Sequence, residues 1–212
     1  MFTSVILGAG KSTRMKANKS KLLFNIAGKP VINHILSSLK AAKAKHNICV
    51  INNSSAELKK ILQAEKISFA YQKILDGTAG AVKAALKSKK NSNSKILILC
   101  GDVPFITSNS IKKLVAKLKN HDAVVGTVEL ESPKGYGRIV RVNNKFSSIV
   151  EEKETTPDER QIREVNTGII AIQENVLRKY ISLIKNNNQK KEYYLTDIIK
   201  ILIDHDKKVT TF

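Results

Sequence analysis

The sequence predicts an α/β fold with a doubly wound, mostly parallel, Rossmann-like sheet. Apolar runs of strand length alternate with segments whose apolar residues recur at i, i+3, i+4 and i+7, the spacing of a helix with one buried face. The expected strands are 3–7, 48–51, 68–71, 96–100, 123–128 and 167–172, and the expected helices are 32–39, 56–64, 79–89, 111–118, 174–184 and 195–203. This β-α-β-α order favours helices on both faces of one sheet.

Two further observations complete the predicted fold. The run 96–100 is apolar without a break, as expected for a strand covered on both faces. The runs 138–142 and 146–150 flank Asn143-Asn144, a pair that tolerates the positive φ angles of a two-residue turn, so we expect an inserted β-hairpin. With 212 residues and 42% apolar content, the chain can bury one sizeable core, and we expect a single domain over residues 1–212.

Composition narrows the classes of partner. The formal net charge is +19, but only six of the 37 basic residues are arginine, the lysines are spread along the chain, and aromatic residues make up 5%. A nucleic-acid partner is therefore not expected. No apolar run is long enough to span a bilayer, so no membrane association is expected either. Cys49 and Cys100 lie in apolar runs without metal-ligand spacing, which indicates buried, reduced thiols in a cytoplasmic protein.

The segment after the first strand is the first place to look for a ligand, because open α/β sheets bind ligands beyond the carboxyl ends of their strands. Its sequence Gly8-Ala9-Gly10-Lys11-Ser12 is glycine-rich and lets the backbone approach phosphate oxygens. It is not a P-loop, because Val5 occupies the first glycine position. It also lacks the third glycine of a dinucleotide fingerprint, where Thr13 stands.

Charge supports a phosphate ligand at this loop. Lys11, Arg14 and Lys21 flank the glycines, and no acidic residue precedes Glu57. A cationic loop at the carboxyl end of a strand suits a triphosphate, whose charge must be neutralised before a second phosphate can attack it. Taken alone, however, the loop remains compatible with a glycine-rich turn that binds nothing.

The motifs taken together resemble the sugar-phosphate nucleotidyltransferases, and among them the N-acetylglucosamine-1-phosphate uridylyltransferases. They appear in the order expected for that group: 7–15, Lys21-Leu22-Leu23, Gln72, Gly77-Thr78-Ala79, Gly101-Asp102-Val103-Pro104, Gly135-Tyr136-Gly137-Arg138, Ile149-Val150-Glu151, Asn166-Thr167-Gly168 and 192–197. The resemblance implies a nucleotide-diphospho-sugar transferase fold. It also implies a reaction of UTP with N-acetylglucosamine 1-phosphate that gives UDP-N-acetylglucosamine and pyrophosphate. Bacterial members commonly carry a fused acetyltransferase β-helix domain, for which this sequence has no repeat.

The resemblance also implies roles for individual residues. Leu7, Gly8, Ala9, Gly10, Gln72, Gly77 and Thr78 would hold the nucleotide; Arg14 and Lys21 would stabilise the phosphates; Gly137, Glu151 and Asn166 would bind the sugar; Asp102 would hold Mg²⁺. From the residues alone, Glu151 is equally compatible with an exposed charge, and Asn166-Thr167-Gly168 with a plain turn. The family's second Mg²⁺ ligand is an asparagine in a late Val-Asn-Asn stretch. No asparagine follows Gln189, so we expect weak metal binding.

Three departures from the family pattern leave the substrates open. Ser20 precedes Lys21 in place of proline, Leu75-Asp76 replaces Gln-Leu before Gly77, and Cys100 replaces an aromatic residue. The alternatives to the uridylyltransferase are therefore a related transferase with another sugar phosphate or base, and an inactive nucleotide-sugar-binding module. The sequence does not predict an oligomeric state.

Overall fold

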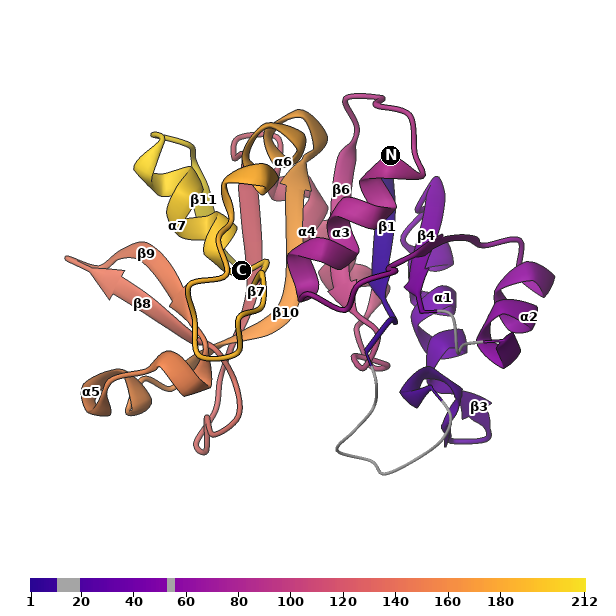
Figure 1. Cartoon of the computed structure of the whole chain (residues 1–212), viewed down its shortest axis with the longest axis horizontal. Helices are drawn as coiled ribbons and strands as arrows, with labels where there is room; N and C mark the ends of the chain where they lie inside the picture. Colours follow the sequence, from indigo (N-terminus) through magenta and orange to yellow (C-terminus); the bar gives the residue numbers. More distant parts are fainter. Residues whose placement is uncertain (11–19, 53–55) are drawn as a thin grey trace.

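The computed structural model describes residues 1–10, 20–52 and 56–212, so Arg14 lies outside the described residues. Its main sheet has the strand order β11-β7-β10-β6-β1-β4-β5, and Figure 1 shows these strands across the centre of the molecule. The strands are β1 (Phe2–Leu7), β4 (His46–Ile51), β5 (Ser68–Tyr71), β6 (Lys95–Cys100), β7 (Ala123–Glu129), β10 (Glu164–Gln173) and β11 (Val209–Thr211). Only β10 runs antiparallel to its neighbours along this path, so the expected mostly parallel sheet is confirmed.

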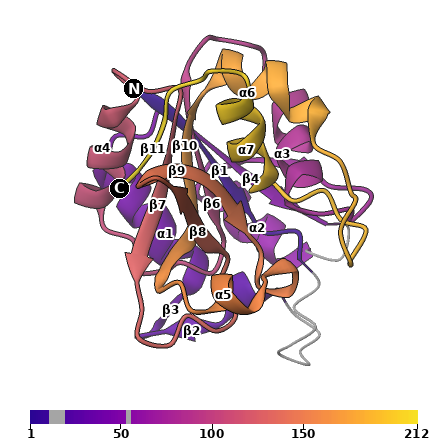
Figure 2. The same cartoon turned by 90° about the vertical axis from the view of Figure 1, so that its left-hand side faces the viewer.

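Helices cover both faces of this sheet, as a doubly wound fold requires. They are α1 (Val31–Ala41), α2 (Ala56–Ala64), α3 (Thr78–Lys87), α4 (Ser108–Lys117), α5 (Pro157–Arg160), α6 (Glu174–Tyr180) and α7 (Asp197–Asp204). One core joins α1, α2 and α4 to the sheet, and a second core joins α3, α6 and α7 to the opposite face. Figure 2 shows α4 and α3 on opposite sides of the strands.

The unbroken apolar run of β6 is explained by these two cores. Leu97 and Leu99 pack with α1 and α4, whereas Ile96 and Ile98 pack with α3 and α6. All four side chains are buried. Burying one such side chain contributes roughly 1.5–3 kcal/mol, so β6 anchors the layers on both sides. Within the described part of the chain, no helix is long and apolar enough to cross a membrane.

The expected hairpin is present as β8 (Arg138–Val142) and β9 (Lys145–Val150). Its turn residues Asn143 and Asn144 have φ angles of 48° and 60°, the left-handed values that the Asn-Asn pair predicted. The hairpin joins the sheet where Arg138 pairs with Val165 of β10, and α7 packs against β9. In Figure 1 it extends away from the sheet beside α5.

Some boundaries differ from the expected ones. The strand expected at 167–172 begins at Glu164, so Asn166-Thr167-Gly168 lies inside β10, where the register shifts, and does not form a plain turn. The helix expected at 174–184 ends at Tyr180 and continues as a 3-10 turn, η4 (Ile181–Leu183). The helix expected at 195–203 begins at Asp197.

Several short elements were not predicted from the sequence. They are the ribbon of β2 (Asn25–Ile26) and β3 (Lys29–Pro30), the 3-10 helices η2 (Lys21–Leu23) and η3 (Glu152–Glu154), and α5. None is long enough to show the periodicity on which the predictions depended. The start of α5 does carry a local signal: Thr156 and Glu159 form a reciprocal capping box.

Candidate functional site

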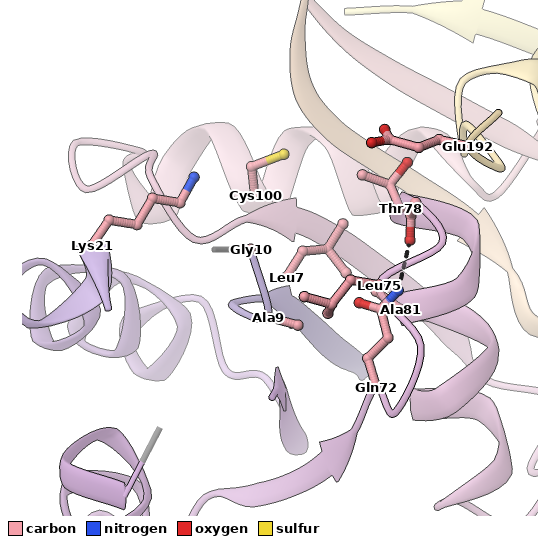
Figure 3. Close-up of a pocket in the computed structure, with 11 residues that line it drawn as sticks. Leu7, Ala9, Gly10, Lys21, Gln72, Leu75, Thr78, Ala81, Cys100 and Glu192 are labelled. Carbon is pink, nitrogen blue, oxygen red and sulfur yellow. Dashed lines mark hydrogen bonds between the residues drawn. The ribbon is translucent and has the colours of Figure 1, made fainter. Parts of the chain in front are cut away.

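A cavity of about 470 Å³ lies beyond the carboxyl ends of the parallel strands β1, β5 and β6. Figure 3 shows its lining, with Lys21 on one side and Gln72 and Thr78 on the other. Seven of the residues expected to bind the nucleotide or its phosphates line it: Leu7, Ala9, Gly10, Lys21, Gln72, Gly77 and Thr78. Leu75, Ala81, Cys100 and Glu192, to which the sequence assigned no role, complete the wall.

Gly8 does not line this cavity, and packing explains why a glycine stands there. Its N–H donates to the Val50 carbonyl at 2.9 Å, which continues the pairing of β1 and β4 beyond the strand end. A Cβ atom at Gly8 would lie 2.7 Å from Leu22 Cδ1 and 3.0 Å from the Val50 oxygen. The absent side chain therefore lets the end of β1 pack between β4 and η2.

The opposite wall is built where α3 begins. Gly77 has a φ of 118°, a conformation that favours glycine, and a Cβ there would lie 2.5 Å from the Tyr193 oxygen. The close approach allows two backbone bonds, from Ala79 N to Tyr193 O at 2.9 Å and from Tyr193 N to Asp76 O at 2.7 Å. These bonds fix the chain around residue 193 against α3 and bring Glu192 to the cavity.

Lys21 and Asp102 form an ion pair at the edge of the cavity. The Lys21 Nζ lies 2.5 Å from Asp102 Oδ2, and the two side chains are 28% and 50% exposed. Asp102 is not a helix cap, because Thr107 caps α4 by accepting a hydrogen bond from Ser110 N at 3.1 Å. The Asp102 carboxylate therefore does not cap α4.

Asp102 fits a magnesium ion that arrives with a substrate. Mg²⁺ usually takes one or two protein carboxylates and fills its other positions with water and substrate phosphates. Among the described residues, no group of three His, Cys, Asp or Glu side chains could hold a metal ion by itself. A half-exposed carboxylate that pairs with Lys21 at the edge of the cavity suits shared coordination.

The three residues expected to bind a sugar lie together beside the hairpin. Asn166 N donates to the Gly137 oxygen at 2.8 Å, and a Cβ at Gly137 would lie 3.7 Å from Glu151 Oε2. Glu151 Oε1 accepts a hydrogen bond from Thr196 Oγ1 at 2.8 Å. Glu151 is thus held in place, in contrast to the alternative of a freely exposed charge. Thr196 was not predicted to have a role, although it lies in the family motif 192–197.

A second cavity, of about 720 Å³, lies between β9 and α7 and shares Glu151 with this group. Asp197 lines it, and burial raises the pKa of that carboxyl to about 6, with a further contribution from Glu151 and Glu154. Tyr194 lines the same cavity, and burial raises its pKa to about 12. Both groups therefore lose their proton at a higher pH than the same groups do in free solution.

The two cysteines differ from each other. Cys49 is fully buried, as expected, and burial raises its pKa to about 12. Cys100, expected to be buried as well, is only partly so, because it ends β6 and lines the cavity beside Lys21. Burial, with a contribution from Asp102, raises its pKa to about 11, so the thiol stays protonated and is a weak nucleophile at neutral pH.

Comparison with known proteins agrees with this geometry. Residues 4–160 match the family model of the MobA-like NTP transferase domain. The chain is 43% identical over 198 residues to the "Bifunctional protein GlmU" of Francisella tularensis subsp. novicida (strain U112) and of Francisella tularensis subsp. tularensis (strain SCHU S4 / Schu 4). Each alignment covers 92% of this chain and 43% of the relative, so the chain spans less than half the length of these curated relatives.

Solved structures share the fold. One, described as a glucose-1-phosphate thymidylyltransferase of Bacillus anthracis, has a TM-score of 0.80 at 19% identity and covers 100% of this chain and 86% of its own. A UDP-glucose pyrophosphorylase has a TM-score of 0.75 at 16% identity, covering 99% of this chain and 89% of its own. The expected nucleotide-diphospho-sugar transferase fold and the resemblance to sugar-phosphate nucleotidyltransferases are thus confirmed. The chain belongs to the family of MobA-like NTP transferase domains.

Proposed function

We propose that the protein transfers a uridylyl group from UTP to N-acetylglucosamine 1-phosphate, giving UDP-N-acetylglucosamine and pyrophosphate. The observation that carries this proposal is the convergence of seven expected residues on one cavity, six of them expected to hold the nucleotide and the seventh, Lys21, its phosphates. The ordered motifs along the chain and the 43% identity to the Francisella relatives support it. The partners of the chain would then be small molecules.

The reaction needs positioning and charge stabilisation. A phosphate oxygen of the sugar phosphate attacks the α-phosphorus of UTP, the bond to the bridging oxygen between the α- and β-phosphorus atoms breaks, and pyrophosphate leaves with that oxygen. Cys100, at the end of β6, lines the cavity proposed for UTP, and a Cβ at Gly168, two residues after Asn166, would lie 2.8 Å from its Sγ. Two anionic substrates held there would meet without a covalent enzyme intermediate.

Among the described residues, Lys21 is the one proposed to stabilise the developing charge. Its ammonium group is held by Asp102 when no substrate is present, and it would exchange this carboxylate for phosphate oxygens when UTP binds. Arg14 is proposed for the same task from the family motif. When bound with the triphosphate, Mg²⁺ would supply further charge neutralisation, and Asp102 is the residue that would hold it.

The two ends of the product would be held differently. Gln72 and Gly77 border the cavity where the base would lie, and both can form hydrogen bonds there. At the other end, Asn166 and Glu151 present an amide and a carboxylate, which suit the hydroxyl and acetamido groups of an N-acetylhexosamine. A Cβ at Gly137 would lie 3.1 Å from Ile149 Cγ2 and 3.7 Å from Glu151 Oε2, so a glycine there lets the backbone approach the sugar-binding group closely.

Pyrophosphate release tests the proposal directly. The protein would be incubated with each pair of UTP, dTTP, CTP or GTP and N-acetylglucosamine 1-phosphate or glucose 1-phosphate, with Mg²⁺ or with a chelator. We expect the fastest release from UTP with N-acetylglucosamine 1-phosphate, and none in chelator. A faster rate with another pair would identify a related transferase instead. Tight binding of UDP-N-acetylglucosamine without turnover of any pair would identify a binding module.

A further inference from the structure

The Gln72 side chain is fixed in one orientation by two acceptors. Its Nε2 donates to the Gly77 carbonyl at 2.9 Å and to Asp76 Oδ1 at 3.1 Å, and the first bond is the dashed line in Figure 3. A carbonyl and a carboxylate can only accept, so the nitrogen of the amide must face both of them. Gln72 is 7% exposed and lines the cavity.

The remaining polar atom of Gln72 is therefore an acceptor. No described residue donates to its Oε1, which leaves that oxygen available to a ligand in the cavity. Gly77 lines the same cavity, and its N–H donates to no other described residue. The cavity wall where β5 meets α3 thus offers one acceptor, Gln72 Oε1, and one donor, the Gly77 N–H.

Asp76 is itself held by its surroundings. Its backbone oxygen accepts from Tyr193 N at 2.7 Å. Its carboxylate lies over Gly80 of α3, where an added Cβ would fall 1.8 Å from Oδ1. The carboxylate occupies this position because residue 80 has no side chain, so Asp76 and Gly80 act together in placing the acceptor for Gln72.

We propose that Asp76 is a specificity-determining residue that positions the Gln72 amide to select a nucleobase carrying an N3–H and an adjacent carbonyl. Uracil presents that N–H donor and carbonyl acceptor, which complement Gln72 Oε1 and Gly77 N–H. Cytosine presents an acceptor at N3 and an amino donor beside it, so both contacts would be mismatched. A site that leaves polar groups unpaired rejects the wrong base strongly. This inference rests on the proposed function, because it places the base beside Gln72.

The test is equilibrium binding of UTP and CTP, because binding needs no turnover. We expect the wild-type protein to prefer UTP, and Asp76→Ala to lower that preference about fivefold, the loss typical of one hydrogen bond. Asp76→Asn retains an acceptor oxygen and should keep the preference. Gly80→Ala keeps Asp76 but displaces its carboxylate, and should lower the preference as Asp76→Ala does, although alanine favours the helix.

A double-variant cycle separates positioning from a general structural effect. In a Gln72→Ala background, Asp76→Ala should change the preference no further, because Asp76 acts through Gln72. The proposal is overturned if the wild-type protein does not distinguish the nucleotides, or if Asp76→Ala stays within twofold of wild type. It is also overturned if Asp76→Asn loses as much as Asp76→Ala, if Gly80→Ala has no effect, or if the Gln72→Ala background leaves the loss intact.

The two proposals fail in different ways. A protein that binds UTP in preference to CTP but releases no pyrophosphate would refute the catalytic proposal and leave the role of Asp76 standing. A protein that makes UDP-N-acetylglucosamine with the same UTP preference in all the Asp76 and Gly80 variants would refute the role of Asp76 and leave the catalytic proposal standing.

Discussion

Two ion clusters mark the opposite ends of β6, and they are built in opposite ways. Before the strand begins, Glu174 is 0% exposed and accepts hydrogen bonds from Lys89 Nζ at 2.8 Å, Ser94 Oγ at 2.8 Å and Arg178 Nε at 3.0 Å. Beyond the other end, Asp102 is 50% exposed and forms an ion pair with Lys21. The first carboxylate has its partners inside the fold, whereas the second can exchange its partner.

This difference separates a structural contact from one that is poised for a ligand. A buried carboxylate with a full set of donors is costly to disturb, because removing its charge leaves buried donors unpaired. A pair as exposed as Lys21 and Asp102 contributes about 0–1 kcal/mol to stability, so releasing it to bind phosphate or metal costs the fold little. The same chemical groups therefore serve stability at one end of the strand and are expected to serve catalysis at the other.

The largest expected effect is on Lys21. Lys21→Ala should lower the rate of pyrophosphate release on the order of 100-fold or more, the usual effect of removing one preorganised charge contact to a transition state. The free energy of unfolding, measured with urea, should change by less than about 1 kcal/mol. Lys29→Ala is the matched control, since Lys29 is an exposed lysine of the nearby ribbon, and it should leave both quantities unchanged. A comparable loss of rate in both variants would show that Lys21 contributes only to the general positive charge of this surface and makes no specific contact with the phosphates.

The second effect is on Glu174, and it should appear in stability. Glu174→Gln keeps the shape of the side chain but removes the charge that Lys89 and Arg178 neutralise. We expect the free energy of unfolding to fall on the order of 3 kcal/mol, with the rate at 25 °C retained. The control is Asp204→Asn, which breaks the exposed pair with Lys200 and should cost at most about 1 kcal/mol. Equal losses in the two variants would contradict the contrast between buried and exposed pairs.

The pH dependence of stability provides an independent check on Glu174. Burial raises the pKa of this carboxyl, but hydrogen bonds from Lys89, Ser94 and Arg178 outweigh burial and lower it to about 2 from 4.5. Because the pKa is lowered in the folded state, its contribution is complete above about pH 4.5 and is lost as pH falls towards 2. Urea unfolding at pH 6, 4 and 3 should show the difference between wild type and Glu174→Gln shrinking with falling pH. A constant difference would mean that ionisation is not its source.

The contrast between the clusters also shows how far sequence reasoning could reach. The strands and long helices were predictable because each carries its own period, and the hairpin because Asn143-Asn144 encodes its turn locally. Lys21 and Asp102 were each singled out by motif, but their pairing joins residues 81 positions apart. The Glu174 cluster, which reaches Lys89 across 85 positions, left no signal in either segment.

At the candidate site, too, contacts between residues far apart in the sequence could not be predicted. Seven of the residues that line the cavity beside Lys21 were predictable, because motif segments follow strands and parallel strands bring their carboxyl ends together. The position of the Asp76 carboxylate beside Gln72 was not predictable, because it depends on the absence of a side chain at Gly80 and on the backbone around Tyr193. In the sequence, Asp76 was only a departure from the family pattern.

The smallest expected effect is on Thr196, at the sugar end. Its hydroxyl donates to Glu151 Oε1 at 2.8 Å, so Thr196→Val removes one hydrogen bond and keeps the branched shape. In this variant Glu151 would remain charged but would be oriented less well. Glu151 thus differs from Asp102, which can exchange its partner, and from Glu174, whose donors all lie inside the fold. We expect the KM for the sugar phosphate to rise about fivefold, the effect of one hydrogen bond, with the KM for UTP unchanged.

The matched control for this variant is Thr210→Val in the edge strand β11, whose side chain bonds only its neighbour among the described residues and should leave both KM values as they are. A change confined to the KM for UTP would show that the group around Glu151 faces the nucleotide. A fall in kcat with both KM values unchanged would show that Thr196 acts on the transition state alone, because an interaction shared by ground and transition states appears in KM. Glu151→Gln in the same assay should exceed Thr196→Val, because it removes the charge that the hydroxyl merely orients.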